Sequence, residues 1–309
     1  MPKTRVLLVG PSSYLGRRLL PRLLDDPRVS LRVLATNRKV LGDAAERVPD
    51  LLEGDPTDPR TLLRAAEGID VAFYPIGFVA ADPEFDRLSR GFPARFRDAC
   101  IEAGVRRIIY LGAGARIATD DSPVTLGSAG TILGDRPDLI QTIWFRAEFV
   151  IGSGSLLFEA LRHLVQKLPV VPAPRWMDTP MSAIGVRDLL DYLCRAVHVP
   201  LDGSVEVAVG LAPLRFRDML AITASAMGLR RAIIPVPIRA RWLSPYLLML
   251  VSPFSTRLAQ RFLETVETEA GTGAGPTTET ARRLFPEVTP APFQVAVARA
   301  VEAIEQEQV

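Results

Sequence analysis

The stretch that decides the fold is Val6-Leu7-Leu8-Val9-Gly10-Pro11-Ser12-Ser13-Tyr14-Leu15-Gly16. Its four consecutive apolar residues are typical of a parallel strand that is buried on both faces. Gly10 suits a tight turn after that strand, and Gly16 allows the helix that follows to pack closely on it. The N–H groups at the start of such a helix can bind the pyrophosphate of a dinucleotide. A plain turn that binds nothing is the alternative.

Strand-like and helix-like segments alternate beyond this turn. Further strands are predicted at Leu31–Ala35, Ile69–Tyr74, Arg107–Leu111 and Leu139–Phe145. Helices are predicted at Tyr14–Leu24, Thr61–Ala66 and Pro83–Ala103, the last with Asp82 as its N-cap. Strands that alternate with helices imply crossover connections. The sequence therefore predicts an α/β fold, a Rossmann-type doubly wound parallel sheet.

The second half of the chain has a weaker pattern. Helices are predicted at Leu156–Leu168, from a cap at Asp188 to Val197, and at Phe216–Met227 and Phe293–Glu305, with a strand at Val205–Val209. We expect residues 1–155 to form the dinucleotide-binding core. Residues 156–309 are expected to form a small substrate-covering region and C-terminal helices, packed on the core as one unit.

Composition limits the partners of the chain. There are 37 basic and 35 acidic residues, and this near-balance argues against nucleic-acid binding. We expect a cytoplasmic protein, because Cys100 and Cys194 suggest no disulfide framework and no segment is long enough to span a membrane. The segment from Arg239 to Arg257 could form an interfacial helix in peripheral contact with a membrane, or a lid or core helix. The oligomeric state is not predicted.

The end of the second predicted strand bears on the choice of cofactor. An acidic residue there would hold a ribose hydroxyl, whereas an arginine accommodates a 2′-phosphate. This chain has Thr36-Asn37-Arg38-Lys39, which favours NADP(H) over NAD(H); a solvated basic loop is the alternative. Asp55 offers a carboxylate for an adenine amino group, while Asp58 is expected to cap the next helix.

Several segments together resemble the atypical short-chain dehydrogenase/reductases, and among them the NmrA-like NAD(P)-binding proteins. They are the glycine turn, Gly54-Asp55-Pro56-Thr57-Asp58-Pro59, Gly104–Gly112, Val150–Ser155, Pro174–Trp176, Ile184–Asp188 and Arg230–Pro237. The resemblance covers most of the chain and implies a cofactor site. Its expected residues are Gly10, Ser12, Ser13, Tyr14, Leu15, Gly16, Thr36, Asn37, Arg38, Asp55, Pro56, Tyr74, Pro75, Ile76 and Gly77.

Hydride-transferring enzymes of this superfamily use a tyrosine acid with a lysine four residues later, and that couple is missing here. The residues four positions after the five tyrosines are Arg18, Phe78, Gly114, Ala196 and Leu250. The catalytic candidates that remain are Ser122, Arg146 and Asp178. Arg146 could clamp a substrate oxygen or pair with Glu148, and Asp178 could act as a base if it is desolvated. No metal-ligand spacing is evident.

Small and aromatic residues suggest an apolar substrate. Gly127, Ala129 and Gly130 leave one helix face bare, which permits a ligand to lie close or a neighbouring element to pack closely. Phe78, Phe92, Phe145 and Trp176 could line a pocket. The first hypothesis is an NAD(P)(H)-dependent enzyme acting on a small, largely apolar metabolite. The alternatives are a non-redox isomerase or cyclase with the cofactor lost or structural, and a non-catalytic NADP(H) sensor or assembly factor.

Overall fold

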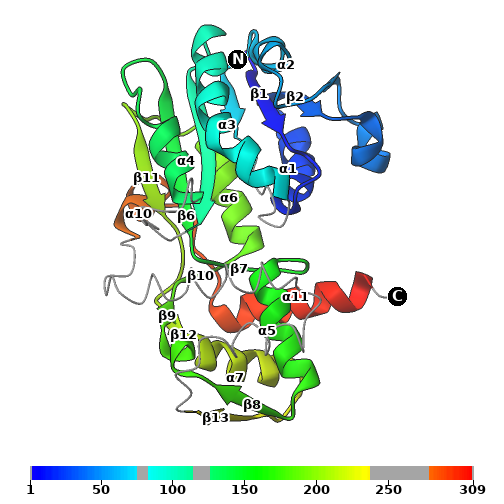
Figure 1. Ribbon diagram of the computed structural model, residues 1–309, viewed down its shortest axis with the longest axis vertical. Helices are drawn as coiled ribbons and strands as arrows, with labels where there is room; N and C mark the ends of the chain where they lie inside the picture. The colour runs from blue at the N-terminus through cyan, green and yellow to red at the C-terminus, as the bar shows by residue number, and fades with distance from the viewer. Residues whose placement is uncertain (1, 75–82, 114–125, 237–277, 308–309) are drawn as a thin grey trace.

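The computed structural model describes residues 2–74, 83–113, 126–236 and 278–307. Within these ranges, seven strands form one parallel sheet in the order β11-β6-β5-β4-β1-β2-β3 (Figure 1). The strands are β1 (Thr4–Val9), β2 (Val29–Ala35), β3 (Asp50–Glu53), β4 (Val71–Phe73), β5 (Arg107–Ala113), β6 (Gln141–Ala147) and β11 (Val205–Ala208). The doubly wound sheet is therefore confirmed, and the ends of the predicted strands and helices move only slightly.

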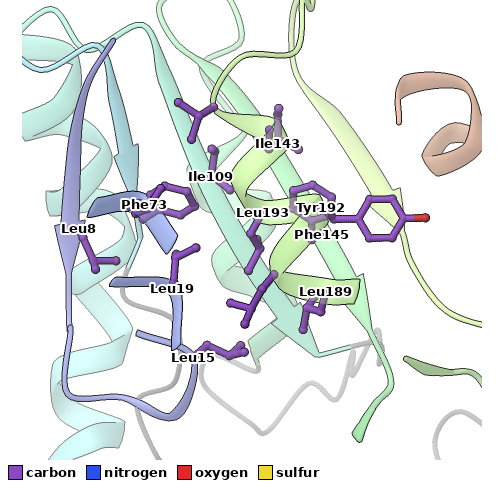
Figure 2. Close-up of a cluster of buried hydrophobic side chains, with 14 of the residues drawn as sticks. Leu8, Leu15, Leu19, Phe73, Ile109, Ile143, Phe145, Leu189, Tyr192 and Leu193 are labelled. Atoms are coloured by element: carbon purple, nitrogen blue, oxygen red, sulfur yellow. The ribbon is translucent and has the colours of Figure 1, made fainter. Parts of the chain in front are cut away.

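Helices cover both faces of the sheet. On one face α1 (Tyr14–Asp25) packs against α6 (Val186–Ala196). On the other face α3 (Pro83–Glu102) contacts both α2 (Pro59–Ala66) and α4 (Leu126–Leu133). Successive strand residues point to opposite faces of the sheet, and both faces are apolar because helices cover both. Leu8 packs with Leu15 and Leu19 of α1 on the first face (Figure 2), whereas its neighbour Leu7 packs on the second.

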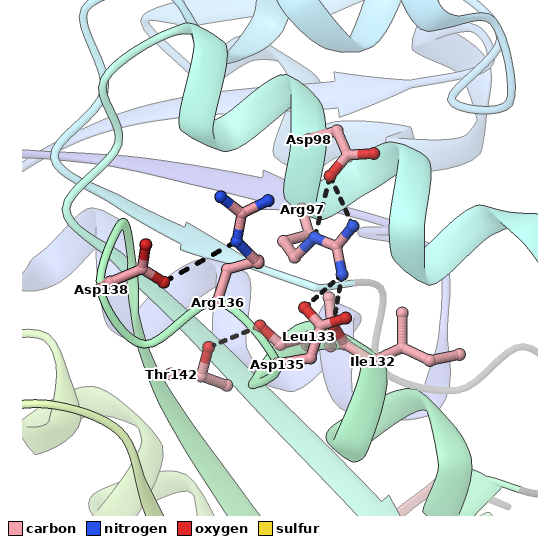
Figure 3. Close-up of polar contacts among 8 residues, drawn as sticks. All are labelled: Arg97, Asp98, Ile132, Leu133, Asp135, Arg136, Asp138 and Thr142. Atoms are coloured by element: carbon pink, nitrogen blue, oxygen red, sulfur yellow. Dashed lines mark hydrogen bonds and ion pairs between the residues drawn. The ribbon is translucent and has the colours of Figure 1, made fainter.

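Polar contacts close the carboxyl end of α4. Arg97 of α3 is buried, donates to the carbonyl of Ile132 at 2.9 Å and pairs with Asp135 (Figure 3). The Thr142 hydroxyl donates to the carbonyl of Leu133 at 3.0 Å. The last carbonyls of a helix have no partner within it, so these two side chains satisfy groups that would otherwise be buried without hydrogen bonds.

A second apolar cluster lies below the sheet in Figure 1. Its helices are α5 (Leu156–Lys167), α7 (Phe216–Ala226) and α11 (Phe293–Glu307). Short strand pairs join them: β7 (Phe149–Ile151) with β10 (Ala183–Gly185), β9 (Pro180–Met181) with β12 (Leu214–Arg215), and β8 (Val170–Ala173) with β13 (Ala232–Pro235). Met177 and Met181 are buried in this cluster.

The second half of the chain also contributes to the sheet. The edge strand β11, the helix α6, and α10 (Glu279–Leu284), which contacts β11, all come from residues beyond 155. The division of the chain at residue 155 stays a prediction. One local expectation is wrong: Gly185, not Asp188, is the N-cap of α6. Asp188 lies in the first turn of that helix, where its carboxylate accepts the N–H of Ala291 at 2.9 Å.

Candidate functional site

The order of strands brings the predicted site residues to one edge of the sheet. From β1 the chain winds outward through β2 and β3, and it then returns to β4 on the other side of β1. Ligands of doubly wound folds bind at the carboxyl ends of the strands, where the winding reverses. Here that point lies between β1 and β4, beside the turn from Gly10 to Gly16.

The glycine turn has the geometry that a phosphate-binding turn requires. Gly10 has a φ of +72°, a conformation that favours glycine. A Cβ on Gly16 would lie 2.3 Å from the Gly10 carbonyl oxygen, so only glycine allows α1 to approach the turn this closely. Ser13 is the N-cap of α1, and its side-chain oxygen accepts the N–H of Gly16 at 3.0 Å. The serine thus stabilises the helix start where the dinucleotide motif usually has glycine.

Two residues of the turn have structural roles. The Leu15 side chain is buried in the core, so any ligand contact there would come from its backbone. The Tyr14 ring lies under the Arg18 guanidinium, whose carbon is 4.2 Å from the ring centre. Arg18 also donates to the carbonyl of Ser153 at 2.6 Å, and a Cβ on Gly152 would lie 2.4 Å from the Tyr14 hydroxyl. Together these contacts hold the 152–154 loop against the start of α1.

Acidic residues accompany the predicted cations at the end of β2. Thr36, Asn37 and Arg38 are exposed there. A cavity of about 620 Å³ is lined by Asn37, Arg38, Lys39, Gly42, Asp43, Ala45, Glu46 and Glu53. The carboxylate of Glu53 accepts the backbone N–H of Arg38 at 2.8 Å, and the Arg38 guanidinium donates to the Ala45 carbonyl at 3.2 Å. The sequence predicted two cations here but not the neighbouring carboxylate, because Glu53 comes from the next strand.

The loop after β3 contains Asp58, which caps a helix as predicted, and Asp55, which also takes part in the turn itself. Asp58 is the N-cap of α2 and accepts the N–H of Thr61 at 2.9 Å, as expected. Asp55 is exposed, but one of its oxygens accepts both the N–H and the hydroxyl of Thr57 at 2.8 Å. That oxygen shapes the turn that contains Pro56, which leaves the other carboxylate oxygen for a ligand.

Tyr74 follows β4 and packs in an aromatic cluster. Its ring meets Phe96 and Tyr110 edge to face at 5.2 Å each. Burial raises the pKa of the Tyr74 hydroxyl far above its usual value, so this group stays protonated and is a poor acid. The other predicted cofactor residues of this loop, Pro75, Ile76 and Gly77, lie outside the described residues, as do Asp82, Ser122 and the segment 239–257.

Arg146 lies at the carboxyl end of β6, where the sequence places it, but it does not pair with Glu148, one of the two alternatives for its role. Its guanidinium pairs with Glu206 of β11 at 2.6 Å. Glu148 instead accepts the N–H of Ser182 at 2.5 Å. Burial raises the pKa of Glu148, although the Ser182 N–H and the charge of Arg146 oppose this shift. Glu148 is thus a further candidate for the site, which the sequence offered only as a partner of Arg146; its position directly after a buried strand is the signal for it.

Asp178 does not meet the condition set for a general base. Its carboxylate is about half exposed (49%) and pairs with Arg217 at 3.0 Å. The condition was desolvation, and a carboxylate that is half exposed to solvent is not desolvated. The contacts of the surrounding η2 turn (Arg175–Asp178) are with α7, in the second apolar cluster.

The bare helix face expected around Gly130 is filled by protein. The indole of Trp144, from β6, lies against it: a Cβ on Gly130 would be 2.4 Å from a ring atom. Phe92 and Phe145, expected to line a pocket, are also fully buried in the two sheet-facing clusters. Of the two readings of this glycine, close packing is therefore the correct one at Gly130.

The described residues contain neither a candidate membrane span nor a candidate metal site. No helix among them is long and apolar enough to cross a membrane. No group of three or more histidine, cysteine or acidic side chains in those ranges is arranged to hold a metal ion.

Comparison with known proteins identifies the fold. No protein-family model matches the chain, and no curated protein matches it. A nucleoside-diphosphate-sugar epimerase from Staphylococcus aureus is 15% identical over 96% of this chain and 100% of its own, with a TM-score of 0.73. The Citrobacter sp. triphenylmethane reductase complexed with NADP(H) is also 15% identical, over 96% and 99%, with a TM-score of 0.73.

A further match binds the other nicotinamide dinucleotide. The UDP-glucuronic acid 4-epimerase from Bacillus cereus, in complex with NAD, is 10% identical over 98% of this chain and 99% of its own, with a TM-score of 0.67. The chain therefore has the Rossmann-like fold of NAD(P)-binding epimerases and reductases. These identities are too low to carry over a substrate, because one fold hosts many chemistries.

Proposed function

We propose that the chain binds a nicotinamide dinucleotide at the Gly10–Gly16 turn and is an enzyme of the atypical short-chain dehydrogenase/reductase type, similar to the NmrA-like proteins. The observation that carries the proposal is the turn itself. It lies where the sheet reverses its winding, and its Gly16 has no room for a side chain. Structural neighbours that bind NADP(H) or NAD support a nicotinamide dinucleotide as the ligand.

The residues of the turn fit a pyrophosphate. The start of α1 offers backbone N–H groups and the positive end of the helix dipole. Ser12 is exposed there and has a hydroxyl proton to donate, whereas the Ser13 side chain accepts the Gly16 N–H at the position of the usual middle glycine. Thr36, Asn37 and Arg38 would face the adenosine ribose, and Asp55 and Pro56 the adenine.

A bound nicotinamide would supply hydride transfer. The chain lacks the Tyr-x-x-x-Lys couple, so a proton donor must come from elsewhere. Glu148 is the group that we propose, because it follows β6 at the site edge and burial favours its protonated form. Arg146 could orient a substrate oxygen as well, but its guanidinium would then bind that oxygen and the Glu206 carboxylate at the same time.

We propose NADP(H) as the preferred cofactor and a small, largely apolar metabolite as the substrate. Arg38 and Lys39 favour a 2′-phosphate, whereas Glu53 on the same cavity favours the ribose hydroxyls of NAD(H). Pairing of Arg146 with Glu206 disfavours an anionic substrate at the end of β6.

The missing couple also favours a second candidate, a non-redox isomerase or cyclase on the same fold. The redox enzyme and the isomerase are distinguished by incubating the protein with NADPH that carries deuterium at C4 and a panel of apolar ketones and enones. Deuterium in the product supports the redox enzyme. Conversion of a substrate without deuterium transfer supports the isomerase, and nucleotide binding without any turnover supports an NADP(H) sensor or assembly factor.

The location of the cofactor is tested with Ser13→Asp. Aspartate is as good an N-cap as serine, so α1 should remain stable while a negative charge repels the pyrophosphate. Titration with NADPH should show affinity reduced about 100-fold or more, in line with the loss of a charge-assisted phosphate contact. The control is Thr278→Asp at the N-cap of α10, which should bind NADPH like the wild type.

A further inference from the structure

A second groove of about 400 Å³ lies on the face of the sheet that carries α1 and α6. Its walls are α1, the 151–153 loop, the start of α6 and the C-terminal helix α11. In Figure 1, α11 runs below the lower ends of α1 and α6. No residue from Gly10 to Gly16 lines it, so it is separate from the dinucleotide turn although both use α1.

Five arginines line this groove. They are Arg17, Arg18, Arg22, Arg187 and Arg299, from three different helices. Two of them are already engaged: Arg18 donates to the Ser153 carbonyl, and Arg22 pairs with Asp191. The single acidic residue of the lining, Asp188, is buried and accepts the Ala291 N–H.

Three of these arginines have no polar partner in the part of the chain that the structure describes. Arg17, Arg187 and Arg299 are exposed, and within the described residues none of them makes an ion pair or a side-chain hydrogen bond. Guanidinium groups on the same groove repel one another, and a bound anion would relieve this repulsion. The N-terminus of α6 also faces the groove, where the Asp188 carboxylate in its first turn offsets part of the positive end of the helix dipole.

We propose that this groove binds an organic di- or triphosphate. Arginine suits phosphate because its planar donors match two oxygens at once. Cations from three helices call for an anion with several charged groups, which a phosphate chain supplies and a single carboxylate does not. The apolar residues of the groove, among them Ile151, Leu190 and Ala300, would contact the organic part of the ligand and add little to the affinity.

The lining also predicts which part of the ligand contributes most of the binding affinity. It contains no aromatic side chain among the described residues, so nothing there would stack on a nucleobase. The phosphate chain therefore carries the affinity. Tripolyphosphate alone should bind nearly as well as ATP, pyrophosphate more weakly, and inorganic phosphate weakest.

The test is calorimetric titration of the full-length protein with tripolyphosphate at low and at physiological salt. The triple variant Arg17→Gln/Arg187→Gln/Arg299→Gln should lose about 100-fold or more in affinity, because it removes three charge-assisted contacts to the phosphates. A matched triple variant, Arg60→Gln/Arg64→Gln/Arg215→Gln, removes the same charge from exposed arginines away from the groove and should bind like the wild type.

Ser13→Asp separates this site from the dinucleotide site. It should lose NADPH binding and keep tripolyphosphate binding, whereas the groove variant should do the reverse. Equal loss in both arginine variants would mean that only net charge attracts the anion, and would overturn the proposal. Loss of tripolyphosphate in Ser13→Asp would assign the anion to the glycine turn and would also overturn it. Absence of tripolyphosphate binding to the wild type contradicts the groove site, whatever NADPH does.

Discussion

The side-chain oxygen of Ser13 accepts the backbone N–H of Gly16 at 3.0 Å, so the residue that replaces the usual middle glycine of a dinucleotide turn is also the N-cap of α1. One residue thus affects both the stability of the helix and the approach of a phosphate. The two effects can be separated by substitution.

Ser13→Ala should lower the free energy of unfolding by about 1 kcal/mol, and Ser13→Gly by only a few tenths, because glycine is a tolerable N-cap and alanine is a poor one. Urea denaturation measures both. Ser13→Gly should also tighten NADPH binding several-fold, since the backbone can then approach the phosphate. Unchanged NADPH affinity in Ser13→Gly would mean that the turn does not hold the phosphate.

The cavity at the end of β2 makes a prediction about cofactor choice. Arg38→Ala should weaken NADPH binding by about tenfold and leave NADH binding nearly unchanged, because it removes a charge that faces the 2′-phosphate. Glu53→Gln should act in the opposite direction and favour NADPH, while its amide oxygen still accepts the Arg38 N–H. Parallel titrations with both nucleotides check this. If Arg38→Ala weakens both equally, Arg38 holds the loop and does not read the phosphate.

Gly130 and Trp144 form a packing pair that can be tested by a double-mutant cycle. Gly130→Ala should lower the free energy of unfolding by about 1–3 kcal/mol, because the new methyl would overlap the Trp144 ring. In a Trp144→Leu background the same substitution should cost much less. Additive costs measured by chemical denaturation would show that the ring does not fill the space beside Gly130.

Asp26 predicts a pH dependence of stability. Its carboxylate accepts hydrogen bonds from the side chain and backbone of Arg28, which lower its pKa from 3.8 to about 2. Its ionised form therefore stabilises the fold above pH 3.8, and this contribution is lost as the pH falls through about 2. Asp26→Asn should cost about 1 kcal/mol at neutral pH, since the exposed Arg28 weakens the pair, and almost nothing at the acid end.

Asp25→Asn is the control for this experiment. Asp25 pairs with Arg47 at 2.7 Å, but both side chains are more than half exposed. Its substitution should change the unfolding free energy very little at any pH. An Asp26→Asn cost that persists unchanged at acid pH would contradict the assigned role of the Asp26 charge.

The sequence was most informative where structure is local. The apolar run from Val6, the turn glycines and the spacing of leucines in α1 all act within one strand-turn-helix unit, and the structure follows them. The alternation of strands and helices likewise predicted the parallel sheet, because crossover connections leave few other arrangements.

Contacts between distant segments were not predictable in this way. Arg146 pairs with Glu206 because β11 aligns beside β6, sixty residues further along the chain. Glu53 reaches the Arg38 loop from the neighbouring strand. Pro172 lies within β8, although proline usually argues against a strand. It is tolerated there because β8 is an edge strand that pairs with β13 alone among the described strands, so a missing N–H on its open side costs no ladder hydrogen bond. These contacts depend on tertiary packing, which the local pattern does not encode.

The most direct test of this account is calorimetric titration of the purified wild-type chain with NADPH, NADP⁺, NADH and NAD⁺, together with mass analysis of any nucleotide that it carries as isolated. We predict saturable binding at one site for at least NADPH, abolished by Ser13→Asp and retained by Thr278→Asp. Absence of binding by all four nucleotides, in protein that is folded and carries none, would contradict the central claim that the Gly10–Gly16 turn is a dinucleotide site.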